Sequence, residues 1–137
     1  MVALAQGFGL LTPAAVSETL RVRVLAAEAL QRTGRPHQQQ ELYLVIAQAA
    51  ALLASASADL SLWASAMQYA RAADAYGEII GHSGVRAYAR GMQATVAYWT
   101  GRYDDAVRYA SAAVEIAPPG VARVRAHMGV IRRWLPL

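Results

Sequence analysis

The stretch YDDAVRYASAAVEIAPP, residues 103–119, decides the fold, because its pattern occurs a second time 40 residues earlier, as WASAMQYARAADAYGEI at residues 63–79. Aromatic and small residues recur at the same places in the two copies. The matched pairs are Trp63 with Tyr103, Ala66 with Ala106, Tyr69 with Tyr109, Ala70 with Ala110, Ala72 with Ala112 and Ala73 with Ala113. A period of this length is typical of helix pairs that stack into a solenoid. The sequence therefore predicts two equivalent units, neither of which buries its apolar face alone.

The residues around these copies also favour helix. Alanine, leucine, glutamine, glutamate and arginine are frequent, and the alternation expected of strands is nearly absent. Thr12 followed by Pro13 predicts a helix start, and Gly34 to Pro36 predicts its end. The predicted elements are two helix pairs, at about 38–81 and 83–118, with flanking helices at about 13–33 and 120–135. We expect one all-α domain over residues 1–137, a right-handed α-α superhelix of about six helices.

Capping residues are predicted at the inner helices. Asp59 or Ser61 is expected to cap the third helix, and Ser83 the fourth. Asp104 and Asp105 fall in the first turn of the fifth, where acidic side chains suit the positive end of the helix dipole.

Composition excludes several kinds of site. The chain has no cysteine, so disulfides and thiolate metal sites are ruled out. His37, His82 and His127 are far apart in sequence and predict no metal site, and no cofactor is expected. The formal net charge is +4 and every basic residue is an arginine, which favours an acidic partner only weakly, because the arginines are spread along the chain.

Two features bear on location. The N-terminal residues have no basic region and no cleavage pattern of a signal peptide. The longest uncharged run, residues 42–58, contains Gln48, Ser55 and Ser57 and is short for a membrane span, so a helix covered by protein explains it better. We expect a cytoplasmic protein that does not span a membrane.

No arrangement of residues predicts catalysis. Asp104 and Asp105 are the only acidic residues close in sequence, and adjacent residues on a helix do not face one another. The serines lack the glycine elbow of hydrolases, and the glycine-rich phrases lack the lysine of a phosphate loop. We therefore expect a binding protein that is not an enzyme.

A stripe along the first helix of each pair is the predicted ligand-binding surface. In the first pair it carries Gln48, Ala51 and Ser55, and in the second it carries Tyr88, Gly91, Thr95 and Tyr98. The alternative is that the tyrosines belong to the core. Arg86 and Arg90, one helical turn apart, can hold a carboxylate or phosphate group, or can pair with Asp59 or Glu78 at a turn. The candidate ligand-binding residues are Gln48, Ser55, Arg86, Tyr88, Arg90, Thr95 and Tyr98.

Residues 87–120 resemble the tetratricopeptide repeat, a helix-turn-helix unit. The positions that match its signature are Ala94, Gly101, Tyr103, Ala106, Ala113 and Pro118. The earlier copy, around Trp63, Ala66 and Ala73, lacks the closing proline and resembles a degenerate repeat.

A further resemblance covers most of the chain. The phrases LLTPAAVSETLRVRVLAAEALQRTGRP, ELYLVIAQAAALLASASADL and ARAADAYGEIIGHSGVRAYARGMQATVAYWTGRYDDAVRYA are similar to the C-terminal helical-repeat region of actinobacterial helix-turn-helix transcriptional regulators. The resemblance implies a sensor or interaction domain that recognises a protein, a peptide or a small signal molecule. The alternative is a freestanding scaffold or homodimerisation module without a ligand.

The DNA-binding domain of such regulators is not found in this sequence. A recognition helix presents arginine, asparagine or glutamine near its start, whereas residues 13–16 read PAAV. We expect no specific nucleic-acid binding by this chain. The last helix, about 120–135, is expected to close the second unit and, through Val130 and Trp134, to contribute to a homodimer.

Overall fold

The computed structural model describes residues 12–118, and over that range the chain is all-helical. The helices are α2 (Pro13–Arg32), α3 (Pro36–Asp59), α4 (Trp63–Ile79), α5 (Ser83–Trp99) and α6 (Tyr103–Ile116). This confirms the predicted all-α class. The two predicted helix pairs correspond in range to α3 with α4 and α5 with α6, and the single domain of about six helices stays a prediction. The predicted helix at 120–135, with Val130 and Trp134, lies outside the described residues, and the right-handed sense of the superhelix stays a prediction.

The predicted start of the first helix is confirmed. The side chain of Thr12 accepts a hydrogen bond from the backbone N–H of Ala15 at 3.1 Å, and Pro13 is the first helical residue. The next helix starts at Pro36, two residues before the predicted position. Proline suits the first helical position because its missing N–H would have no partner there.

The predicted caps of α4 and α5 were wrong. Asp59 is the last residue of α3, and the N-cap of α4 is Leu62, which makes no side-chain capping bond. The N-cap of α5 is His82, whose Nδ1 accepts a hydrogen bond from the backbone N–H of Val85 at 3.0 Å, and Ser83 is already helical. Asp104 and Asp105 do lie in the first turn of α6, as expected.

Three turns of one type join the helices from α3 to α6. Each contains a residue with positive φ, and these residues are 20 apart: Ser61 (59°), Gly81 (67°) and Gly101 (80°). In each turn the next residue donates its backbone N–H to the carbonyl five residues earlier, at 2.8 to 2.9 Å. This is the Schellman arrangement, in which a left-handed residue ends the helix.

The substitution Ser61→Gly should stabilise the protein by about 0.5 kcal/mol. A side chain in the left-handed region costs about 1 to 2 kcal/mol, and the greater freedom of glycine in the unfolded chain offsets part of this gain. The reciprocal change Gly101→Ser should destabilise by about 1 kcal/mol for the same reason. Urea denaturation gives the change in the free energy of unfolding for each variant. A loss of stability in Ser61→Gly would contradict the prediction.

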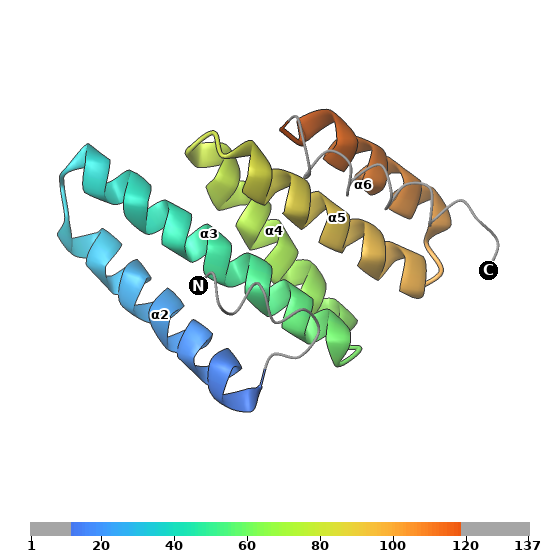
Figure 1. Cartoon of the computed structure of the whole chain (residues 1–137), viewed down its shortest axis with the longest axis horizontal. Coiled ribbons are helices and arrows are strands. Elements are labelled where there is room, and N and C mark those ends of the chain that lie inside the picture. The colour runs from blue at the N-terminus through green and yellow to red at the C-terminus, as the bar shows by residue number, and fades with distance from the viewer. Residues whose placement is uncertain (1–11, 119–137) are drawn as a thin grey trace.

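The helices stack in chain order, so that each packs against the next from α2 to α6, and α3 also contacts α5 directly (Figure 1). The same alanines fill the contacts in both pairs. Buried alanines that lie 40 residues apart are Ala47 and Ala87, Ala49 and Ala89, Ala54 and Ala94, Ala66 and Ala106, Ala70 and Ala110, and Ala73 and Ala113. Small side chains allow close approach of neighbouring helices, so the repeat seen in the sequence is a repeat of packing positions.

Helix α3 is the described helix whose composition raises the question of a membrane span. By length and composition it could cross a membrane, since an 18-residue window has a mean hydropathy of 1.5. Half of that window is buried, because α3 packs against α2, α4 and α5. The same composition is typical of a core helix, so the apolar character of α3 is weak evidence for a membrane span.

Candidate functional site

The seven candidate residues divide into two groups. Five of them lie on the less covered faces of α3 and α5: Gln48, Ser55, Tyr88, Thr95 and Tyr98. Tyr88 is 41% exposed and the other four are half-buried. The other two, Arg86 and Arg90, are on the opposite side of α5 from Tyr88, because successive helical residues are about 100° apart.

Four residues of the first group, all but Tyr98, lie on the less covered sides of α3 and α5, which we call the α3–α5 face. Its residues are Gln48, Leu52 and Ser55 of α3 and Tyr88, Gly91, Met92 and Thr95 of α5. Gln48 and Ser55 precede Tyr88 and Thr95 by 40 residues, so they occupy equivalent positions in the two pairs. Because α3 contacts α5 directly, the two stripes are neighbours.

The α3–α5 face differs from the predicted stripe at four residues: Leu52 and Met92 belong to it, whereas Ala51 and Tyr98 do not. Ala51, expected to face outward, is buried in a cluster with Val85 and Ala89 of α5. Ala51 is covered because the side of α3 that carries it packs against α5. Gly91, in contrast, is half-buried, and a Cβ built on it meets no atom within 4 Å. The α3–α5 face therefore has open space at its α5 side.

Tyr98 belongs to an aromatic cluster at the turn between α5 and α6. Its ring centroid lies 5.3 Å from that of Trp99 and 5.7 Å from that of Tyr103, both edge-on. Trp99 and Tyr103 are 65% and 63% exposed. Trp99 was not among the residues predicted from the sequence, and two consecutive aromatic residues directly before a turn are the signal that points to it. Exposed aromatic side chains that touch one another are typical of contact surfaces.

Arg86 and Arg90 form ion pairs with Asp74 of α4. The Nε of Arg86 lies 3.2 Å from Oδ1, and an Nη of Arg90 lies 3.1 Å from Oδ2. The expected partners Asp59 and Glu78 were wrong, because Asp59 ends α3 and Glu78 is exposed, whereas Asp74 faces α5. Ligand binding by the two arginines stays a prediction, and any such ligand would compete with a carboxylate already in place.

This partly buried cluster of Asp74, Arg86 and Arg90 has two further features. Arg90 also donates to the side-chain oxygen of Gln93 at 3.3 Å, while its Nε is buried without a hydrogen-bond partner among the described residues. A Cβ added to Gly77 would lie 2.9 Å from Cγ of Arg86. Glycine at this position therefore lets the stem of Arg86 pass close to α4 on its way to Asp74.

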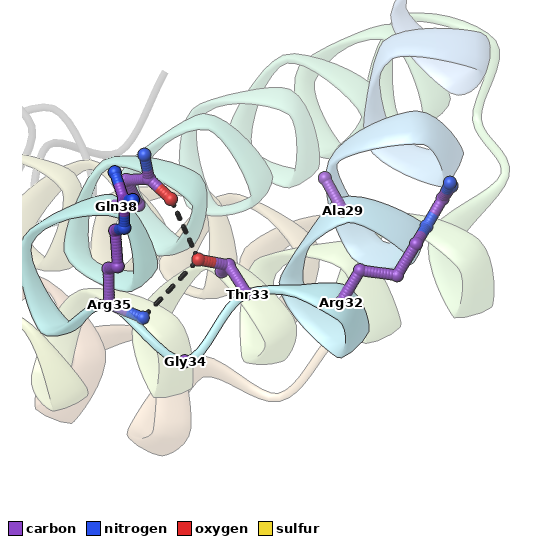
Figure 2. Close-up of a pocket in the computed structure, with 6 residues that line it drawn as sticks. All are labelled: Ala29, Arg32, Thr33, Gly34, Arg35 and Gln38. Atoms are coloured by element: carbon purple, nitrogen blue, oxygen red, sulfur yellow. Dashed lines mark hydrogen bonds between the residues drawn. The ribbon is translucent and has the colours of Figure 1, made fainter.

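The turn between α2 and α3 contains a hollow of about 510 Å³ (Figure 2). Thr33 donates to the side-chain oxygen of Gln38 at 2.7 Å and accepts from the backbone N–H of Arg35 at 3.3 Å. Arg32 is paired with Glu28 at 3.7 Å. The hydroxyl of Thr33 links Gln38 and Arg35 within this exposed turn, and the hollow contains none of the seven candidate residues.

A second hollow, of about 290 Å³, lies beside the start of α4, the end of α5 and the N-cap of α6. We call it the Trp63 groove. It is lined by Trp63, Ala64, Met67, Gln68, Arg71, Val96, Thr100 and Arg102. It shares no residue with the seven candidates or with the α3–α5 face.

The two histidines of the described chain, His37 and His82, each make a separate local contact. His37 lies 3.1 Å from Glu41 one turn along α3, and His82 caps α5. Within residues 12–118 no three metal-ligating side chains of histidine, aspartate or glutamate come together. His127 lies outside the described residues.

Comparison of the chain with family models, with curated proteins and with solved structures found no match.

Proposed function

We propose that this chain is an interaction domain that binds a protein or peptide segment, or a small signal molecule, on the α3–α5 face. By its sequence resemblance it would be related to the sensor region of a transcriptional regulator, acting in the cytoplasm by binding and without catalysis. The packing of α3 among three helices supports a protein in water.

The observation that carries the proposal is the contrast between the two sides of α5. Its buried side repeats the alanines of α3 at matched positions, as the stacking requires. Its other side carries Tyr88, Gly91 and Thr95, and the packing of the helices does not explain why these residue types are present there. Glycine in a helix interior costs about 1 kcal/mol relative to alanine, and at Gly91 the described chain leaves the space empty. A ligand that approaches the backbone closely explains why a glycine stands there.

The test uses peptides selected for binding from a random dodecapeptide display library, with the unmodified chain as bait. Gly91→Leu should weaken the binding of the selected peptides at least about tenfold, because the new side chain occupies the space on the α3–α5 face. Its melting temperature should not fall, since leucine is the better helix former. The matched control is Gly34→Leu, at which a Cβ also meets no atom within 4 Å. Equal loss in both variants, or none in Gly91→Leu, would contradict the proposal.

One observation favours the alternative, a homodimerisation module. The aromatic cluster of Tyr98, Trp99 and Tyr103 is exposed at one end of the described helices. Such a module would be dimeric at about 100 µM by sedimentation, would become monomeric in Trp99→Ser, and would bind no selected peptide. A monomer at that concentration would remove this alternative.

A further inference from the structure

The Trp63 groove combines an apolar floor with a basic rim. Met67 and Val96 are buried and form the floor, where they pack in one cluster with Ala66. Trp63 is half-buried and forms a wall, whereas Arg71 and Arg102 are exposed at the rim. An apolar hollow with a few convergent polar groups is the usual form of a small recognition site.

The two rim arginines lack a carboxylate partner within the described chain. Four other arginines of the described chain do have one: Arg86 and Arg90 pair with Asp74, Arg32 with Glu28, and Arg108 with Asp105. The only side-chain bond of Arg102 within residues 12–118 is from its Nε to the hydroxyl of Thr100, at 3.4 Å, and none is found for Arg71. Arg102 is the N-cap of α6, and Asp104 and Asp105 follow it in the first turn of that helix. The residues that line the groove itself include these two arginines and no acidic residue, so its lining is positively charged.

Comparison of the two helix pairs shows that the stacking does not require this charge. The floor residue Met67 corresponds to Val107, so an apolar side chain stands there in both pairs. Arg71 corresponds to Ser111, and Arg102 corresponds to Leu62. Positions that the packing determines carry the same alanine in both pairs, whereas the rim positions differ in charge and size.

We propose that the Trp63 groove docks an acidic peptide segment of a partner protein. An apolar side chain of that segment lies on Met67 beside Trp63, and a neighbouring carboxylate pairs with Arg71 and Arg102. The volume of about 290 Å³ admits one large side chain and the adjacent acid, so the recognised element is two or three residues long. Arginine suits this role because its guanidinium binds carboxylates through two donors at once.

The test probe is a short acetylated and amidated peptide in which leucine is flanked by two glutamates within a glycine-serine frame. Its binding to the full chain is followed by fluorescence anisotropy and by the indole N–H signals of the three tryptophans. The signal of Trp63, assigned with Trp63→Phe, should shift on binding. The double variant Arg71→Gln with Arg102→Gln should weaken binding at least about tenfold, and raised salt should weaken binding to the unmodified chain.

Matched controls separate the groove from general charge. The double control Arg21→Gln with Arg35→Gln removes two charges from exposed arginines outside the groove and should change binding less than twofold. A probe with glutamine in place of both glutamates should bind much more weakly. Equal binding of the two probes, equal loss in the two double variants, or no shift at Trp63 would overturn the proposal. Displacement of the probe by inorganic phosphate, but not by acetate at equal ionic strength, would reassign the groove to phosphate groups and also overturn it.

This site is independent of the α3–α5 face. Gly91→Leu should leave binding of the acidic probe unchanged, and the double variant of Arg71 and Arg102 should leave the display-selected peptides unaffected. The two proposals can therefore fail separately. If Gly91→Leu abolished binding of the acidic probe, the probe would be on the α3–α5 face and the assignment to the Trp63 groove would be wrong.

Discussion

Replacing Asp74 by asparagine should lower the free energy of unfolding by about 2 kcal/mol, because a hydrogen bond to a charged group contributes about 1.5 to 3 kcal/mol and the two arginine partners are partly exposed. Asp74 is the common partner of Arg86 and Arg90, and the exposed fractions of these three side chains are 12%, 26% and 28%. Without the carboxylate, two cations face each other in a poorly hydrated contact between α4 and α5. Urea denaturation measures the change, and the matched control Glu78→Gln, at an exposed acid of the same helix, should shift stability by less than about 0.5 kcal/mol.

A triple variant distinguishes the effect of removing Asp74 alone from the effect of replacing all three charged residues of the cluster. In the first helix pair, Ile46 and Ala50 occupy the positions of Arg86 and Arg90, and both are buried. Val114 occupies the position of Asp74 in the second pair. The combination Asp74→Val, Arg86→Ile and Arg90→Ala should therefore recover most of the stability lost in Asp74→Asn, because apolar replacement of a whole buried cluster is often neutral or stabilising. A triple variant as unstable as Asp74→Asn would contradict this explanation.

The substitutions Ala66→Leu and Ala106→Leu should each destabilise the protein by about 1 to 3 kcal/mol, the usual cost of overpacking a filled core. The two alanines are 0% and 1% exposed and occupy equivalent positions in α4 and α6. Ala66 packs with Met67 and Val96, so additional methyl groups would push these side chains out of their rotamers.

Denaturant titration of the two leucine variants should give losses of similar size, because the sites are equivalent by packing. Ala75→Leu is the control, since Ala75 is exposed on α4 and its replacement should change stability by less than about 0.5 kcal/mol. If Ala106→Leu were neutral while Ala66→Leu was costly, the two helix pairs would not be equivalent.

Most helix boundaries could be predicted, but two caps could not. Capping preferences favoured Asp59 or Ser61 for α4 and Ser83 for α5. In the structure only three residues separate the helices at each inner turn, and the residue that closes the turn is also the N-cap of the next helix. Leu62, His82 and Arg102 hold this place. The geometry of the turn therefore determines which residue becomes the N-cap, whatever the capping preference of its side chain.

The sequence by itself determined the helical class, the 40-residue equivalence and the residues that share one side of α5, because these depend on periodicity along a helix. It predicted that Tyr88 and Thr95 lie on one face with equivalents at Gln48 and Ser55. Only the tertiary structure decided which edges of those faces are covered. Ala51 shares the period of its neighbours, yet the contact between α3 and α5 buries it.

The tertiary structure also decided the partner of Arg86 and Arg90. Their spacing shows that both point the same way, but several carboxylates were compatible with it. Asp74 is 12 residues from Arg86 and 16 from Arg90. It meets them only because α4 and α5 pack antiparallel across a turn, with Gly77 permitting the close approach. Local periodicity fixes the direction of a side chain along its own helix, whereas the identity of its partner depends on how closely a second helix approaches.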